Sequence, residues 1–345
     1  MKKSNLLRGL AATTGTLLTL MTILTGTAMS YSKTLNSYLN IKAGEMVPLD
    51  GAQETADTMY YKSAYGDLTV ENLARLKADA EAFVEQEMVE GAVLLENNDN
   101  ALPLAGGERK VTLFGLATAK PYYKNSSAGG NNDPSREVSF YTALKEKGFE
   151  INDTLYNAYL VPDPSENTQG GGFFGNSAPS VNEKPADFYT DDIKKSFADY
   201  KDVAIVMIGR GGGESADISL KDDEGISGLA LHKNEADMLK MINESGQFDK
   251  IILIVNCAYP LELNYLEEYN IDAVLWIGTA GLVGFRGVAD ILVGEANPSG
   301  RLVDTYATNS LSAPASQNMG DYTFENADEI IAGAKDDAGN TTKYA

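Results

Sequence analysis

Short runs of apolar residues, rich in Val and Ile, recur along the chain and predict buried strands. The clearest run is residues 203–208, where six consecutive apolar positions fit a strand covered on both faces of a sheet. A further short apolar strand is predicted directly after Glu90. The other predicted strands are residues 110–116, 250–256 and 273–277.

Stretches with apolar residues at three- and four-residue spacing separate these runs and predict helices. The longest is residues 70–90, whose apolar stripe from Leu73 to Met88 we expect to pack on the body of the protein. Strands alternating with helices predict an α/β fold, in which a mostly parallel sheet is sandwiched between helices. The other predicted helices are residues 136–147, 193–200, 234–244, 261–269 and 284–292.

The amino terminus has the pattern of a targeting segment. Lys2, Lys3 and Arg8 precede an uncharged stretch that extends to residue 32, so residues 1–32 predict an export signal or a membrane anchor. A small-x-small sequence that ends at Ser30 could be a cleavage site, but the stretch is also long enough to cross a bilayer. We therefore expect a secreted or cell-surface protein, membrane-anchored if the segment is not cleaved. Residues 33–69 are predicted to be a linker.

A glycine-rich loop follows the 203–208 strand and carries two carboxylates, Glu214 and Asp217. It begins at the carboxyl end of a predicted parallel strand, where α/β proteins bind ligands. A solvated acidic turn is the alternative interpretation, because acidic residues are common on surfaces. The loop does not fit a dinucleotide-binding site, because Glu214 occupies the position of the last glycine of that motif.

Composition excludes several classes of function. The net charge of −21 argues against nucleic-acid partners, whose binding depends on Lys and Arg. Cys257 and His232 are the only residues of their kinds. The sequence therefore offers too few Cys and His residues for a typical zinc site, and a single His for Ser-His-Asp or Cys-His catalysis. We expect no metal and no cofactor, although the acidic residues 222–224 could coordinate calcium weakly.

Three ordered motifs stand out along the chain: Glu90-Gly-Ala-Val-Leu-Leu with Asn100-Ala-Leu-Pro-Leu104, Gly209-Arg-Gly-Gly-Gly-Glu-Ser-Ala-Asp217, and Gly294-Glu-Ala-Asn-Pro-Ser-Gly-Arg-Leu302. Together they resemble the α/β-sandwich domain of glycoside hydrolase family 3. The resemblance implies an (α/β)6 sandwich, a six-stranded, mostly parallel sheet between helices, over residues 70–320, with residues 321–345 an incomplete continuation. In the family this domain normally follows a (β/α)8 barrel, whereas here it comes first, which resembles members with reversed domain order.

The resemblance also assigns candidate site residues. Glu214 matches the family's general acid/base, while Asp217 and Arg210 are given supporting roles. The nucleophile is expected on a barrel domain that this chain does not contain, so we expect the chain alone to be inactive. Candidate substrate contacts are Tyr122, Tyr123 and Asn125, which follow the 110–116 strand at the same predicted sheet edge.

The leading hypothesis is a domain of a retaining, exo-acting β-glycosidase that hydrolyses terminal non-reducing β-linked sugars. Glucose is the expected sugar and xylose the alternative, so the expected substrate is an oligosaccharide or β-glucoside. The expected protein partner is a barrel domain of the same longer chain, and contact with a membrane is expected only through the N-terminal segment. A surface-tethered, non-catalytic carbohydrate-binding module and an inactive truncation product remain the other hypotheses.

Overall fold

A computed structural model describes residues 2–31, 64–65, 69–123, 134–163, 183–211 and 226–314 of the chain. The chain divides into two compact units, Met1–Gly66 and Asp67–Ala345.

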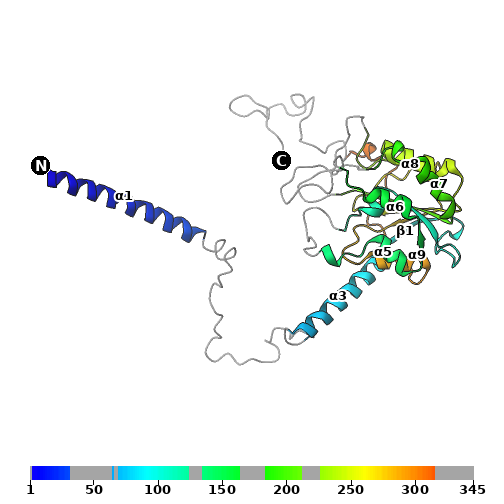
Figure 1. The fold of residues 1–345 in the computed structure, drawn as a ribbon, viewed down its shortest axis with the longest axis horizontal. Helices are drawn as coiled ribbons and strands as arrows, with labels where there is room; N and C mark the ends of the chain where they lie inside the picture. The colour runs from blue at the N-terminus through cyan, green and yellow to red at the C-terminus, as the bar shows by residue number, and fades with distance from the viewer. Residues whose placement is uncertain are drawn as a thin grey trace. The chain divides into compact units, whose positions relative to one another are not determined.

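In the first unit, most of the described residues belong to one long helix, α1 (Lys2–Ser30) (Figure 1). Its stretch Leu7–Ser30, 24 residues, is long and apolar enough to cross a membrane. Threonine hydroxyls along this stretch donate to the carbonyl four residues earlier, as Thr16 does to Ala12 at 3.0 Å and Thr22 to Leu18 at 2.9 Å. These bonds satisfy the hydroxyls within the helix, so the threonines are compatible with an apolar environment.

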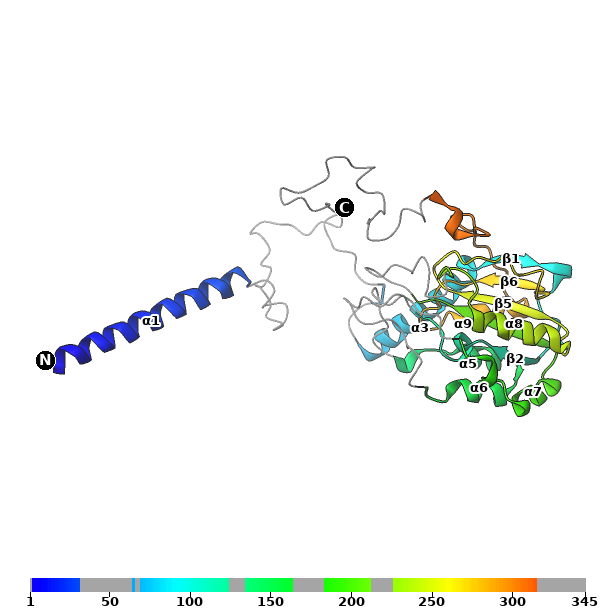
Figure 2. The ribbon, with the colours of Figure 1, turned by 90° about the horizontal axis from the view of Figure 1, so that it is seen from above.

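The second unit is built on a six-stranded sheet with the order β1-β6-β5-β4-β2-β3 (Figure 2). Every neighbouring pair is parallel except β1 with β6, which confirms the predicted mostly parallel sheet. The strands are β1 (Val93–Asn97), β2 (Lys110–Phe114), β3 (Glu150–Ile151), β4 (Val203–Gly209), β5 (Ile251–Asn256) and β6 (Ala273–Trp276).

Helices cover both faces of the sheet. Alternate residues of β4 enter two separate hydrophobic cores: Val203, Ile205 and Met207 face one, whereas Ala204, Val206 and Ile208 face the other. This alternation explains why the strand is apolar throughout. The first core is covered by α3 (Val70–Gly91), α5 (Phe140–Glu146) and α9 (Phe285–Val293), and the second by α6 (Asp153–Leu160), α7 (Asp191–Ser196) and α8 (Lys233–Ser245).

The predicted packing of the first helix of this unit is only partly right. The C-terminal part of α3 packs on α9, where Met88 is buried and the backbone of Glu85 lies against Gly287. Leu73, Leu76 and Phe83, by contrast, are exposed, and Figure 1 shows the helix extending out from the sheet. The amphipathic pattern predicted the helix correctly but not how much of it would be covered.

The predicted helix over residues 261–269 is wrong, because residues 261–263 have no regular structure and residues 264–269 form turns. Glu262 explains part of the difference. Its N–H donates to the carbonyl of Leu229, and its carboxylate accepts from the backbone N–H and the hydroxyl of Ser310, both at 2.6 Å. The segment is thus fixed by bonds to distant parts of the chain. Helix α6 and strand β3 were not predicted, and the remaining short elements are α4 (Leu116–Ala119), η1 (Asn98–Asn100), η2 (Pro134–Arg136), η3 (Ala186–Phe188), η4 (Phe197–Asp199) and η5 (Ser310–Ser312).

Candidate active-site edge

The carboxyl ends of the four central parallel strands meet at one edge of the sheet. β2, β4, β5 and β6 end there at Phe114, Gly209, Asn256 and Trp276. The glycine-rich loop leaves this edge from β4, as predicted. Its first residues, through Gly211, are described, whereas Glu214, Asp217 and Asn125 lie outside the described residues.

Arg210, the residue after β4, is buried and forms a doubly hydrogen-bonded ion pair with Glu235 of α8. Its Nη1 lies 2.5 Å from Glu235 Oε1, and its Nη2 lies 2.8 Å from Oε2. The side chain also donates to the carbonyls of Gly209, Gly228 and Ala230, at 3.0, 3.3 and 3.1 Å. Burial by itself would lower the pKa of Arg210, but the facing Glu235 carboxylate outweighs it, and the net pKa is raised.

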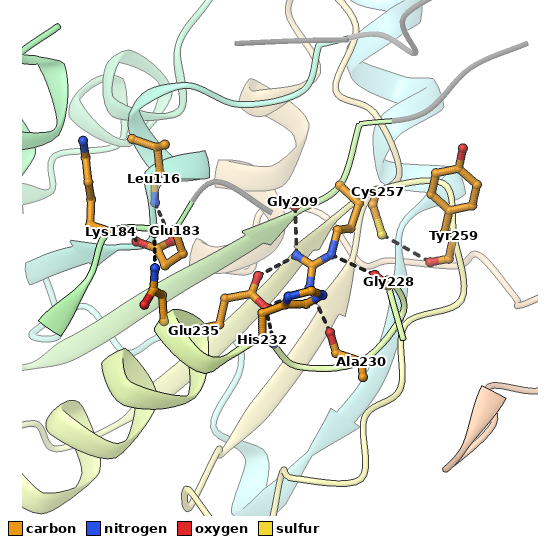
Figure 3. A network of polar contacts seen from close by, with 12 residues as sticks. Leu116, Glu183, Lys184, Gly209, Gly228, Ala230, His232, Glu235, Cys257 and Tyr259 are labelled. Atoms are coloured by element: carbon orange, nitrogen blue, oxygen red, sulfur yellow. Dashed lines mark hydrogen bonds and ion pairs between the residues drawn. The ribbon is translucent and has the colours of Figure 1, made fainter. Parts of the chain in front are cut away.

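Glu235 is only 2% exposed and was not predicted as a site residue. Besides pairing with Arg210, its Oε2 accepts from the backbone N–H of His232 at 3.0 Å, at the start of α8. The sequence does carry a signal for this second role, because a glutamate three residues after a helix start is typical of a capping box. Figure 3 shows Glu235 lying among His232, Gly209, Gly228 and Ala230.

The ring of Tyr122 packs against the backbone at the start of the loop. A Cβ atom added to Gly209 or to Gly211 would lie only 2.7 Å from atoms of the Tyr122 ring, so these glycines allow the ring to contact the loop backbone closely. Burial raises the pKa of Tyr122. The neighbouring Tyr123 ring packs edge-on against Phe285, with centroids 5.7 Å apart. Substrate contact by these two tyrosines therefore stays a prediction, with their rings turned at least partly toward the protein.

Asn256, at the end of β5, is fully buried and connects three segments of this edge. Its side chain bonds to the backbone of Tyr122 and donates to the carbonyl of Gly278 at 2.7 Å, after β6. Sequence reasoning missed it, although a polar residue that ends an apolar strand is a recognisable signal.

Glu183 is another carboxylate at this edge, half-buried rather than fully buried, and it was not predicted. It accepts from the backbone N–H of Leu116, after β2, and from its neighbour Lys184, both at 2.9 Å (Figure 3). Burial raises the pKa of the Glu183 carboxyl to about 7, and the nearby Glu235 charge adds to the rise. The edge thus holds a carboxyl group that titrates near neutral pH.

A pocket of about 310 Å³ lies at the opposite edge of the sheet. It is lined by Asn97, which pairs with the first residue of β6, and by the turn that follows α9, including Gly294 and Pro298. It therefore lies at the other end of the strands from Gly209, where the glycine-rich loop begins. In the part of the chain that the structure describes, no three His, Cys, Asp or Glu side chains are grouped so that they could hold a metal ion.

Residues 92–340 match the model of the glycosyl hydrolase family 3 C-terminal domain. The chain belongs to glycosyl hydrolase family 3. The match covers the sheet, the buried ion pair and the glycine-rich loop, and it confirms the resemblance read from the three motifs.

Curated relatives and solved structures agree with this family. The chain is 29% identical to a β-glucosidase of Ruminococcus albus over 251 residues, which cover 71% of this chain and 25% of the relative. It is 28% identical to β-glucosidase A of Butyrivibrio fibrisolvens over 281 residues, with 72% and 32% covered. A β-glucosidase structure from Paenibacillus barengoltzii matches with a TM-score of 0.60 and 26% identity, over 70% of this chain and 25% of that protein. β-Glucosidase 3B of Thermotoga neapolitana, solved with α-D-glucose, matches with a TM-score of 0.56 and 25% identity, over 71% of this chain and 33% of that protein.

These matches cover only part of each relative. The chain spans about a quarter to a third of the length of the β-glucosidases that it resembles. The family and the fold therefore apply to this chain directly, whereas the activity of the whole relatives does not.

Proposed function

We propose that this chain supplies the general acid/base of a retaining, exo-acting β-glycosidase, and that Glu214 is that residue. The observation that carries the proposal is the origin of the loop that bears Glu214: it leaves the carboxyl end of β4, in a domain of family 3. Ligand sites of parallel α/β sheets lie at this edge. Relatives named β-glucosidases favour a terminal glucose as the sugar, with xylose as the alternative.

Retaining glycoside hydrolysis needs two carboxyl groups about 5 to 5.5 Å apart. One attacks the anomeric carbon, and the other first donates a proton to the leaving oxygen and then activates water. We propose that Glu214 performs the second role. The nucleophile would come from another domain, a (β/α)8 barrel of a longer polypeptide, which fits the partial coverage of the relatives.

Other residues of the loop and edge are given supporting roles. Asp217 would raise the pKa of the acid or orient the loop by its nearby charge. Tyr122 and Tyr123 follow β2 and α4 at the same edge, and together with Asn125 they remain the candidates for substrate contact.

We also propose that the catalytic domain acts outside the cytoplasm. The apolar helix α1 follows basic residues at the amino terminus, which fits an export signal or an anchor.

The assay of the proposed function uses the complete gene product in which this chain occurs. Glu214→Ala should slow cellobiose hydrolysis by about 10² to 10⁴, because departure of a poor leaving group needs the proton donor. An activated aryl β-glucoside should be affected far less in its first step, and added azide should partly restore turnover by replacing water as the nucleophile. Asp217→Ala should show no azide rescue, and Asp222→Ala serves as a matched acidic control. Cellobiose and xylobiose hydrolysis both within about threefold of the unaltered enzyme, a change of about 0.6 kcal/mol, would refute the role of Glu214.

A further inference from the structure

Most of the glycine-rich loop lies outside the described residues, but the backbone on both sides of it is described. The side chain of Arg210 bonds to both of these flanking segments. Arg210 precedes residues 211–227, and its guanidinium donates to the carbonyl of Gly209 on the entry side. On the exit side it donates to Gly228 through Nε and to Ala230 through Nη2. A single guanidinium therefore holds both ends of the loop together.

All the donors of this side chain are in use. Arginine has five side-chain N–H groups. Three of the Arg210 bonds go to the carbonyls of Gly209, Gly228 and Ala230, and two go to the carboxylate of Glu235. Arg210 is therefore saturated within the protein, and it has no N–H left to bind a sugar hydroxyl or carboxylate. Its role must be exerted through the backbone that it holds.

Glu235 keeps the guanidinium in this orientation. The carboxylate lies on α8, which Met238, Leu239 and Ile242 anchor in the second core. Its two oxygens face Nη1 and Nη2, a fork-to-fork arrangement that fixes the plane of the guanidinium. A buried ion pair is weak evidence for stability, because desolvation offsets the attraction, so its best-supported use is to specify geometry.

We propose that Glu235, acting through Arg210, is a positioning residue that clamps the two ends of the loop bearing Glu214. Glu214 is only four positions after Arg210, so its Cα stays within about 14 Å of the clamp whatever path the backbone takes. The intervening glycines have the most backbone freedom to lose, and a fixed starting point reduces the number of positions that the carboxylate can sample. The catalytic meaning of the clamp rests on the proposed function, but its effect on the loop does not.

Hydrogen exchange measured by mass spectrometry on the 345-residue chain tests the clamp without any activity assay. Glu235→Gln keeps an oxygen for the His232 N–H but loses the charge and one acceptor of the pair. Arg210→Lys keeps the charge but offers only three donors, which cannot reach all five acceptors. Both variants should speed exchange in residues 211–227 by at least about tenfold, equivalent to about 1.4 kcal/mol. Peptides from β5 and α8 should exchange within about twofold of the unaltered chain.

Glu244→Gln is the matched control, because Glu244 is an exposed carboxylate of the same helix whose ion pair, with Lys240 at 3.7 Å, lies on the solvent side. It should leave exchange in residues 211–227 unchanged. Unchanged loop exchange in both clamp variants would overturn the proposal, as would equal acceleration of all peptides. A loop that already exchanges at the unprotected rate in the unaltered chain, or failure of both variants to fold, would assign the pair to folding alone and overturn it too.

A second measurement, in the complete gene product, connects the clamp to catalysis. Glu235→Gln should lower kcat for cellobiose by at least about tenfold more than kcat for an activated aryl β-glucoside, since only the former needs a well-placed acid. Equal losses on both substrates would show that the clamp does not act through the acid. Absence of glycosidase activity in the unaltered product would instead refute the proposed function and leave the exchange result standing.

Discussion

The side chain of Asn256 pairs with both backbone groups of Tyr122. Its Oδ1 accepts the Tyr122 N–H at 2.7 Å, and its Nδ2 donates to the Tyr122 carbonyl at 3.1 Å. A side-chain amide thereby imitates a strand neighbour for a segment that is not part of the sheet. The same Nδ2 reaches the carbonyl of Gly278, so one residue of β5 aligns the segments that follow β2 and β6.

Asn256→Ala should lower the free energy of unfolding by about 2–4 kcal/mol, because it leaves the Tyr122 N–H and the Gly278 carbonyl without this buried partner. The Tyr122 carbonyl keeps a second bond, from the N–H of Ala280. Urea denaturation followed by circular dichroism measures the change. Asn157→Ala, at an exposed position of α6, is the control and should shift stability by less than about 0.5 kcal/mol. Equal effects of the two substitutions would contradict the structural role of Asn256.

Gly209→Ala should destabilise the chain by about 1–3 kcal/mol, because the new methyl group would overlap the ring of Tyr122, 2.7 Å away. Gly107→Ala is the matched control, since a Cβ there meets nothing within 4 Å. Combining Gly209→Ala with Tyr122→Leu should recover part of the loss, and a thermodynamic cycle measures the coupling. Strict additivity of the two substitutions would show that there is no interaction energy between the Tyr122 ring and the backbone at Gly209.

Glu183 should make stability depend on pH between about 4.5 and about 7, its ordinary and its raised pKa. Over this range the folded state keeps a proton that the unfolded state has released, so stability is full at the acidic end and falls as pH rises. The loss is at most about 3 kcal/mol for this partly buried group. Glu183→Gln should remove this fall, as measured by urea midpoints from pH 4.5 to 8.

The exposed Glu150 offers a control for that measurement, and Glu150→Gln should keep the pH profile of the unaltered chain. Parallel profiles for Glu183→Gln and the unaltered chain would mean that Glu183 ionises equally easily in the folded and unfolded states.

The amino-terminal helix predicts where the chain is found. Expressed with residues 1–32 in a bacterial host, the chain should be recovered outside the cytoplasm, because Lys2, Lys3 and Arg8 precede the apolar stretch. Sequencing the amino terminus then separates the two forms: a chain starting at Tyr31 was cleaved after Ser30, whereas an intact one that resists carbonate extraction is anchored. Recovery of the intact chain in the cytosolic fraction would contradict export.

Local sequence determined where the strands lie and which strand the glycine-rich loop follows. The apolar runs at β4, β5 and β6 are nearly continuous because both faces of each strand are buried, so their pattern alone identifies them as the inner strands of a parallel sheet. In β2 the polar Thr112 interrupts the run, although it too is buried. The same pattern places the glycine-rich loop at the carboxyl edge, since it directly follows β4. The motifs along the chain identified the family for the same reason: each is a short, continuous segment whose chemistry depends on neighbours in sequence.

Tertiary structure alone decided what holds that loop. Glu235 and Arg210 are 25 residues apart, and Asn256 and Tyr122 are 134 apart. No local pattern reveals such pairs, because a glutamate on an amphipathic helix is usually solvated and only the packing of α8 in the second core brings this one to the guanidinium. The irregular segment at residues 261–269 follows the same principle: hydrogen bonds between Glu262 and both Leu229 and Ser310 override a helical periodicity that the sequence does contain. Sequence thus fixes which segments are buried, while the partners of buried polar groups depend on contacts that form only when distant segments pack together.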